Sequence, residues 1–190
     1  MQPSRGTTSK PPSLLNRMSS HKPVQMSFTI AIDQREKAPY SFEGIKGDHN
    51  QNYWPLIIPT ETAFLLTGDY SIIGMEELVC VERKTKEDLY STLGQNRERF
   101  KAEHERMAEM ASAVVIVEST LADALRFPPD RSRLLPKIVF RTALSWWHRY
   151  GVPWYFVGGR RLAEVQTFWT LEKFWHFEME RRKLQLVDEI

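Results

Sequence analysis

An acidic and a basic residue stand two positions apart where an apolar stretch of the chain ends. Residues 78–81 are apolar, a pattern typical of a buried strand, and Glu82, Arg83 and Lys84 follow directly. Because side chains alternate along a strand, Glu82 and Lys84 point to one side and Arg83 to the other. We therefore expect a carboxylate and an amine to be held together at the rim of a sheet.

Carboxylates also mark the neighbouring strands. Asp33 ends the predicted strand "SFTIAID", Asp69 lies in "TGDYSI", and Glu82 follows "LVCV". Carboxylates gathered at one edge repel one another, and a divalent cation relieves that repulsion. Oxygen ligands without clustered His or Cys favour magnesium or manganese over zinc. The sequence therefore predicts Mg2+ or Mn2+ as the cofactor and no small-molecule cofactor.

The elements that must position these residues alternate between strand and helix signals from Ser27 onward. Strands are expected over residues 27–33, 77–84, 112–119 and 151–158. Helices are expected from Lys86 with a break at 94–96, over 136–150, and from Arg161 to about Lys183. After a long loop over 34–59, segment 62–74 is expected to form a hairpin, with Gly68 and Asp69 at its turn or at the head of its second strand. The order predicts an α/β fold, a central mixed sheet flanked by helices.

Composition predicts a single domain over residues 28–184. The chain has 190 residues, 42% of them hydrophobic, which is enough for one core. Residues 1–27 contain four basic residues, no acidic one and many Pro and Ser, which predicts a disordered basic tail. No apolar run approaches the roughly 20 residues of a membrane helix, and no signal-like segment opens the chain. We expect an intracellular protein without a membrane partner, in the cytoplasm or nucleoid if its source is prokaryotic or viral.

Asp69, followed after twelve residues by Glu82-x-Lys84, matches the D…E-x-K signature of restriction-endonuclease-like nucleases. So short a pattern also arises by chance, and a solvated strand end with a surface ion pair would produce it as well. Longer motifs in residues 28–118 add to it: "IDQRE", "GDYSI", "VERKTKEDL" and "STLGQNR". In order and spacing they resemble the motifs of the XPF-type structure-specific endonucleases.

The resemblance implies a restriction-endonuclease-like nuclease fold and metal-dependent hydrolysis of phosphodiester bonds in branched or flap-like DNA, in repair or recombination. Asp69 and Glu82 would hold the metal, and Lys84 would position or deprotonate the attacking water. Since Arg83 faces away from Glu82, we expect it to support the site or to contact phosphate. The other matched positions, at the active site or along the same rim, are Asp33, Asp88, Arg35, Glu36 and Arg97.

A basic segment in the second half of the chain offers a surface for DNA. Residues 131–151 begin a predicted helix-strand-helix unit over 131–184 and contain five Arg or Lys residues and no acid. A basic helix face backed by an apolar one, with Trp146 in the core, suits phosphate contacts, although an ordinary solvated face has the same pattern. Together with Arg35, Glu36 and Arg97 of the matched motifs, the residues assigned to DNA are Arg131, Arg133, Lys137, Arg141, His148 and Arg149.

The last predicted helix carries aromatic residues around most of its circumference, namely Phe168, Trp169, Phe174, Trp175 and Phe177. A helix apolar over so wide an arc is either enclosed by its own domain or shared with a second subunit, so we expect a homodimer contact there. The histidines have no metal-ligand spacing and are expected at the surface or in the tail.

Two other functions stay open at this point. A non-catalytic DNA-binding scaffold would keep the fold without the chemistry, but Asp69, Glu82 and Lys84 are all present. The second alternative is a restriction-like or RNA-directed nuclease that uses the same chemistry on another nucleic acid. Cleavage assays on matched DNA and RNA substrates distinguish these alternatives.

Overall fold

The computed structural model describes residues 22–49, 52–130 and 132–188. The strands in this part of the chain are β1 (Val24–Gln25), β2 (Ile30–Asp33), β3 (Lys46–His49), β4 (Asn52–Ile57), β5 (Thr60–Ala63), β6 (Tyr70–Ile72), β7 (Val79–Lys84), β8 (Ser112–Val117) and β9 (Trp154–Phe156). The helices are α1 (Lys86–Gly94), α2 (Arg97–Met107), α3 (Leu121–Arg126), α4 (Pro136–Tyr150) and α5 (Arg160–Asp188). The predicted tail falls largely outside the described residues, and the domain bounds stay a prediction.

Among the described residues, six strands form the central sheet in the order β5-β2-β6-β7-β8-β9. β7, β8 and β9 run parallel, whereas β6 runs antiparallel to both β2 and β7. Parallel neighbours need crossover connections, and the pairs α1–α2 and α3–α4 provide them. The sheet is mixed and flanked by helices, which confirms the predicted fold class. β1, β4 and β3 form a separate small sheet.

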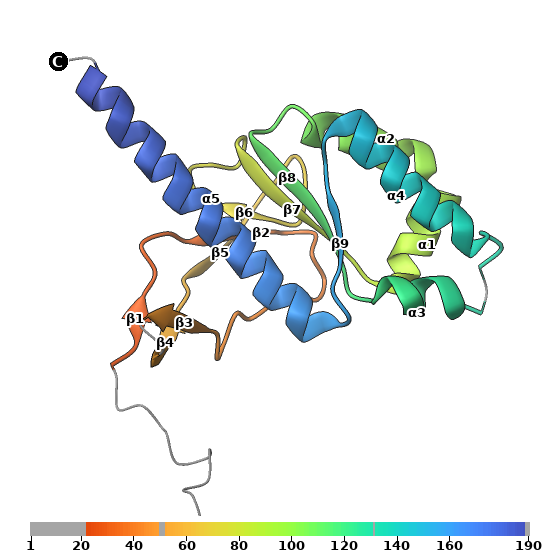
Figure 1. The fold of residues 1–190 in the computed structure, drawn as a ribbon, viewed down its shortest axis with the longest axis horizontal. Coiled ribbons are helices and arrows are strands. Elements are labelled where there is room, and N and C mark those ends of the chain that lie inside the picture. Colours follow the sequence, from red (N-terminus) through yellow and green to blue (C-terminus); the bar gives the residue numbers. More distant parts are fainter. Residues whose placement is uncertain (1–21, 50–51, 131, 189–190) are drawn as a thin grey trace, which may run out of the picture.

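Strand β7 is buried on both faces of the sheet. On one face, Val81 belongs to a core shared with Phe168 and Leu171 of α5. On the other face, Cys80 belongs to a core shared with Phe100 of α2 and with residues of α1 and α4. In Figure 1 the helices α1 to α4 gather on one side, and α5 runs separately across the strands. Because side chains alternate along β7, both cores hold it in place, and its end becomes a fixed support.

The hairpin predicted over residues 62–74 is wrong. β5 pairs parallel with β2, and β6 pairs antiparallel with β2 on its other side, so β2 separates the two strands. The connection is wider than a hairpin turn, and Leu65 within it is buried. Gly68 and Asp69 do lie at the head of the second strand, directly before Tyr70. The predicted loop over 34–59 contains the paired strands β3 and β4, and α3 has no counterpart in the prediction.

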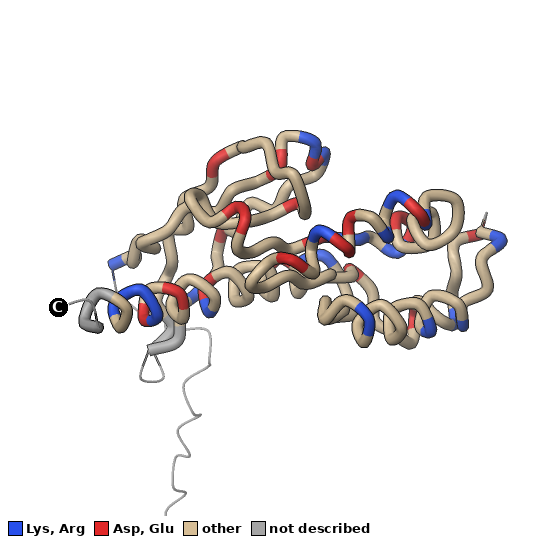
Figure 2. The backbone as a smooth tube through the Cα atoms, turned by 90° about the horizontal axis from the view of Figure 1, so that it is seen from above, with Lys and Arg blue, Asp and Glu red and all other residues tan. Residues whose placement is uncertain are grey.

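The surface charge of the described chain is mixed. Figure 2 shows Lys and Arg close to Asp and Glu along the backbone, in keeping with a net charge of +2 for the whole sequence. Affinity for an anionic partner must therefore come from local basic groups. Within the described ranges, no helix has both the length and the apolar character that crossing a membrane requires.

Candidate active site

The end of β7 carries the predicted acid and amine side by side. Glu82 is 3% exposed, and the Nζ of Lys84 donates a hydrogen bond to Glu82 Oε1. Arg83 points to the opposite face, where its Nε donates to Glu118 Oε1 at 2.7 Å. The alternation expected for the three residues is present. The Glu82–Lys84 pair is buried, unlike the solvated surface pair that the short motif alone would also fit.

Asp69 reaches the same place from the connection before β6. Its N–H donates to the carbonyl of Val81 at 2.9 Å, and its Oδ2 accepts the N–H of Arg83 at 2.7 Å. Gly68 allows this close approach, since its φ is +78° and a Cβ there would lie 2.8 Å from the Cβ of Cys80. The backbone of Asp69 is therefore locked against β7.

Burial and neighbouring charges shift the titration of these groups. Burial raises the pKa of Asp69 to about 6, although the charge of Lys84 acts in the opposite direction. Burial and the charge of Asp69 together raise the pKa of Glu82 well above its usual range. Burial disfavours the charged form of Lys84, but the negative charges of Glu82 and Asp69 raise its pKa to about 12. At neutral pH Lys84 is thus a cation beside Asp69 and Glu82, and the charge of Asp69 disfavours the ionised form of Glu82.

These side chains line a polar pocket of about 580 Å3. Helix α1, helix α2 and the junction between them add Asp88, Thr92, Asn96, Arg99, Phe100 and Glu103 to its walls. The ring centre of Phe100 lies 4.7 Å from Lys84 Nζ, within range of a cation–π interaction. The two helices therefore close one side of the pocket and hold the amine in position.

Asp33 also lines the pocket, but its carboxylate is engaged in structural bonds. Oδ1 accepts the backbone N–H and the Nε–H of Arg35 at 2.8 and 2.7 Å, and Oδ2 accepts Nη2–H of Arg35 at 3.0 Å and the N–H of Leu65 at 2.8 Å. Partial burial acts to raise the pKa of Asp33, but these hydrogen bonds hold it below its usual value. Asp33 therefore anchors the rim, and Arg35 stays 56% exposed at the pocket.

Arg83 and Glu36 lie in a second charged cluster, apart from the residues that line the pocket. Besides its bond to Glu118, Arg83 donates from Nη1 to Glu36 Oε1 at 3.1 Å. The hydroxyl of Tyr40 donates to Glu118 Oε1 at 2.8 Å. The cluster joins the end of β7 to the end of β8 and to the loop after β2. Of the two roles predicted for Arg83, this geometry favours support, and Glu36 binds Arg83 instead of facing the pocket.

The donor set fits a hard divalent cation. Asp69 and Glu82 are oxygen donors, and the charge of Asp69 raises the pKa of Glu82, a repulsion that a bound cation would relieve. Within the described ranges, no group of three or more His, Cys, Asp or Glu side chains is arranged to hold a metal ion. Two carboxylates supplemented by water and substrate phosphate are the usual protein environment of Mg2+.

Helix α4 presents the basic face expected from its sequence. Lys137, Arg141 and His148 are exposed, whereas Val139 and Trp146 are buried. α4 packs against α1 and α2, the helices that wall the pocket. Of the other residues assigned to DNA, Arg133 and Arg149 are exposed and Arg131 lies outside the described residues.

Arg97 is tied to α4 instead of standing free at the start of α2. Its Nη1 donates to Thr142 Oγ1 at 3.0 Å, and its guanidinium lies 5.2 Å from the ring centre of Trp146. These contacts join α2 to α4 beneath the basic face. A DNA contact through Arg97 stays a prediction.

Sequence reasoning missed Glu103 and Glu118. Glu103 lies one turn beyond Arg99 on α2. The helical spacing of Asn96, Arg99 and Glu103 was the signal that would have placed these three residues toward the pocket. Glu118 follows β8 directly, just as the charged residues of β7 end that strand. An acid after a buried parallel strand was the available clue to its place.

The expectation that all histidines lie at the surface or in the tail is wrong for His104. Its side chain is fully buried, with its ring centre 4.6 Å from that of Phe100 and 4.7 Å from that of Trp146. Its Nδ1 lies 3.3 Å from the carbonyl oxygen of Phe100, which fits a neutral ring that donates there. Burial lowers the pKa of His104 to about 4, so the ring is uncharged at neutral pH.

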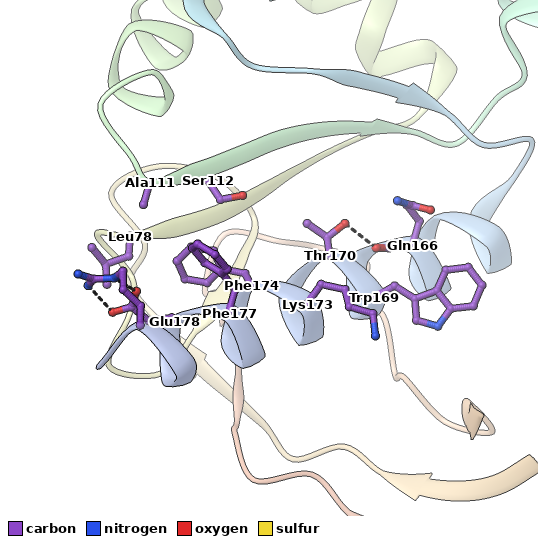
Figure 3. A pocket seen from close by; sticks show the side chains of 11 residues that line it. Leu78, Ala111, Ser112, Gln166, Trp169, Thr170, Lys173, Phe174, Phe177 and Glu178 are labelled. Carbon is purple, nitrogen blue, oxygen red and sulfur yellow. Dashed lines mark hydrogen bonds and ion pairs between the residues drawn. The ribbon is translucent and has the colours of Figure 1, made fainter. Parts of the chain in front are cut away.

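A separate groove runs along α5. Figure 3 shows Trp169, Phe174 and Phe177 of α5 along this groove, with Leu78 and Ala111 across from them at the strand beginnings. Trp169 and Phe177 are 50% and 65% exposed. Leu78 directly precedes β7, whereas Glu82 and Lys84 stand at its far end. The groove is therefore distinct from the polar pocket.

Comparison with known proteins gives one family and one fold. The ERCC4 domain model matches residues 32–158. No curated protein sequence matches the chain. A structure of XPF from Aeropyrum pernix is 19% identical, with a TM-score of 0.57 over 76% of this chain and 60% of that one. A second structure, XPF from Aeropyrum pernix in complex with DNA, is 18% identical, with a TM-score of 0.56 over 76% and 64%.

The chain spans less than two thirds of the length of either Aeropyrum pernix structure. At these identities the likeness is one of fold, and it agrees with the mixed sheet and flanking helices described above. The family model covers the segment from the second half of β2 to just beyond β9 and therefore contains Asp69, Glu82 and Lys84.

Proposed function

The chain belongs to the ERCC4 domain family, and from that membership and the pocket at β7 we propose that it is a metal-dependent DNA endonuclease. It hydrolyses phosphodiester bonds, on branched or flap-like DNA, in repair or recombination. The observation that carries the proposal is the convergence of Asp69, Glu82 and Lys84 in one pocket from two separate segments of the chain. DNA in one of the Aeropyrum pernix structures adds support by analogy of fold.

Asp69 and Glu82 would hold Mg2+ or Mn2+ through their carboxylates. When bound, such a cation lowers the pKa of water and neutralises charge on the phosphoryl oxygens. In the metal-free site the negative charges of Glu82 and Asp69 raise the pKa of Lys84 to about 12, so its amine is protonated there at neutral pH. It orients the attacking water and stabilises the negative charge that develops on the phosphate.

The reaction forms a bond between the water oxygen and phosphorus, with loss of one water proton to solvent, and breaks the bond from phosphorus to the leaving sugar oxygen, which takes up a proton from solvent. The chain contributes by holding the reacting groups in line between the end of β7 and the wall that α1 and α2 form. Arg35, Lys37 and Arg99 line the same pocket and are suited to the flanking phosphates.

Cleavage of end-labelled DNA tests the proposal. Single-stranded, duplex, flap and fork DNA are incubated with Mg2+ or Mn2+, and wild type is compared with Asp69→Asn and Lys84→Ala. Matched controls are Glu61→Gln, on the edge strand β5, and Lys46→Ala, on β3 of the small sheet. Both residues are exposed. We expect cleavage that chelation and both active-site substitutions abolish and that both controls retain.

Two outcomes would favour the other functions. Firm DNA binding without cleavage by wild type would favour a non-catalytic scaffold subunit. Cleavage of matched RNA in preference to every DNA substrate would favour a nuclease of the same chemistry with another target.

We also propose that the chain forms a homodimer through the groove along α5. Trp169 and Phe177 expose large apolar surface there, and an apolar partner surface would remove it from water. Light scattering at low and high protein concentration measures the mass. We expect a dimer that Phe177→Glu converts to a monomer, whereas a monomer mass for wild type at both concentrations would exclude the contact.

A further inference from the structure

Two large apolar side chains stand exposed in the segment that leads to the polar pocket. Phe64 is 62% exposed and Leu66 is 71% exposed, whereas Leu65 between them is buried. Scattered exposed apolar residues are common on protein surfaces, but these two flank one anchored residue and precede Gly68, which lines the pocket, by only a few positions. The contact of Phe64 with Arg35, which lines the pocket, and not exposure alone, points to a ligand.

The backbone that presents them is held by polar contacts to pocket residues. The N–H of Leu65 donates to Asp33 Oδ2 at 2.8 Å, and the carbonyl of Leu65 accepts Nη2–H of Arg35 at 2.6 Å. Further along, Arg106 Nε donates to Thr67 Oγ1 at 3.1 Å. The exposed side chains therefore project from a segment fixed relative to the carboxylates, which lowers the entropy cost of binding.

Positive charge accompanies the aromatic ring. The guanidinium carbon of Arg35 lies 5.4 Å from the ring centre of Phe64, and the side chain of Arg35 is 56% exposed. Arg35 and Lys37 also line the pocket. An aromatic ring backed by a cation and followed by basic groups suits a nucleobase whose phosphate lies toward the pocket.

We propose that Phe64 and Leu66 form a platform for an unpaired nucleobase next to the phosphate that is cleaved. The inference rests on the proposed nuclease function. Within a continuous duplex both faces of a base are covered by its neighbours, so a base that stacks on Phe64 comes from a junction between single-stranded and double-stranded DNA. The platform would thus contribute to the preference for branched over continuous DNA.

Fluorescence of 2-aminopurine tests the platform without cleavage. A fork DNA carries the probe in turn at the unpaired positions nearest the junction, and stacking on an aromatic ring quenches it. The background is Asp69→Asn, whose amide oxygen can still accept the N–H of Arg83. Phe64→Ala and Phe64→Trp are added to it, with Phe127→Ala as the control because Phe127 is equally exposed at 61% and does not line the pocket.

We expect quenching with Asp69→Asn alone, and also when either Phe64→Trp or Phe127→Ala is added to it. Phe64→Ala should remove the quenching and weaken fork binding by on the order of tenfold. Equal quenching with and without Phe64, or no quenching with any variant, would overturn the inference.

Cleavage in the wild-type background separates the two proposals. Phe64→Ala should slow cleavage of fork DNA relative to continuous duplex, and Phe64→Trp should restore it. If wild type cleaves fork DNA and Phe64→Ala changes nothing, the platform fails and the nuclease stands. If wild type cleaves no DNA, the proposed function fails, and the quenching alone decides the platform.

Discussion

The guanidinium of Arg83 donates hydrogen bonds to both carboxylate oxygens of Glu118, from Nε to Oε1 at 2.7 Å and from Nη2 to Oε2 at 3.2 Å. Arg83 lies in β7 and Glu118 directly follows the neighbouring parallel strand β8, and each side chain is 9% exposed. Arg83 lies between Glu82 and Lys84 in sequence but binds on the other face of the sheet. The pair therefore fixes the strand end from which Glu82 and Lys84 project.

Glu118→Ala should lower the free energy of unfolding by about 3 kcal/mol, because it leaves the buried charge of Arg83 with one partner fewer. Urea unfolding measures the change. Glu105→Ala is the matched control, since Glu105 pairs with Lys101 at 3.6 Å on the surface and should matter by less than about 1 kcal/mol. Equal effects of the two substitutions would show that the Arg83 cluster is not a support.

Gly68→Ala should lower the free energy of unfolding by about 1–3 kcal/mol and displace Asp69. The added Cβ would meet Cys80 at 2.8 Å, and the φ of +78° strains a residue with a side chain. Gly94→Ala is the control, because a Cβ there meets nothing within 4 Å and Ala favours a helix. Thermal unfolding and cleavage rates check both. A neutral Gly68→Ala would contradict the tight approach of the two segments.

His104 should make stability depend on pH. The pKa of His104 is about 4 in the folded protein and 6.5 in the unfolded chain. The neutral ring therefore contributes stability that is fully present above pH 6.5 and is lost as the pH falls toward 4. The loss should reach roughly 3 kcal/mol. Urea unfolding between these pH values measures it. His104→Phe should flatten the dependence and His148→Gln, which alters an exposed ring, should not.

Asp69→Asn should stabilise the metal-free protein at pH 8 while abolishing cleavage. Burial raises the pKa of Asp69 to about 6 from 3.8, so its ionised form is disfavoured in the fold, and removing the charge should gain up to about 3 kcal/mol. Added Mg2+ should then stabilise wild type but not the variant. Urea unfolding with chelator and with Mg2+ gives both comparisons. Equal stabilisation of both proteins by Mg2+ would argue against Asp69 as a ligand.

Lys137→Ala and Arg141→Ala should each weaken DNA binding and reduce the slope of log affinity against log salt by about 1, as expected for one lost phosphate contact. Fluorescence anisotropy with labelled fork DNA at several salt concentrations measures the slope. Lys46→Ala removes an exposed charge far along the chain in the small sheet and should leave the slope unchanged. If Lys137→Ala and Arg141→Ala both keep the salt slope of wild type, as Lys46→Ala should, then α4 does not face DNA.

Local sequence patterns predicted the central strands and the main helices. Buried strands such as β7 and β8 are short apolar runs, and α4 matches its predicted span of 136–150, because Pro136 opens it and Gly151 ends it with a left-handed φ of +72°. The opposite orientations of Glu82 and Arg83 also followed from strand geometry alone. These features depend on near neighbours in the chain, which a sequence displays directly.

Features that depend on distant partners were decided by the tertiary structure. The sequence between β5 and β6 has turn residues, but only the pairing of both strands with β2 separates them. Likewise, nothing next to Arg83 predicts Glu118 as its partner. Helical spacing places His104 on the face of Phe100 and Met107, but only the packing of Trp146 and Trp154 against it buries its ring. The sequence by itself determined which residues carry the chemistry and how they alternate. The tertiary structure decided which of them share the pocket, because sheet order and helix packing join segments far apart in the chain.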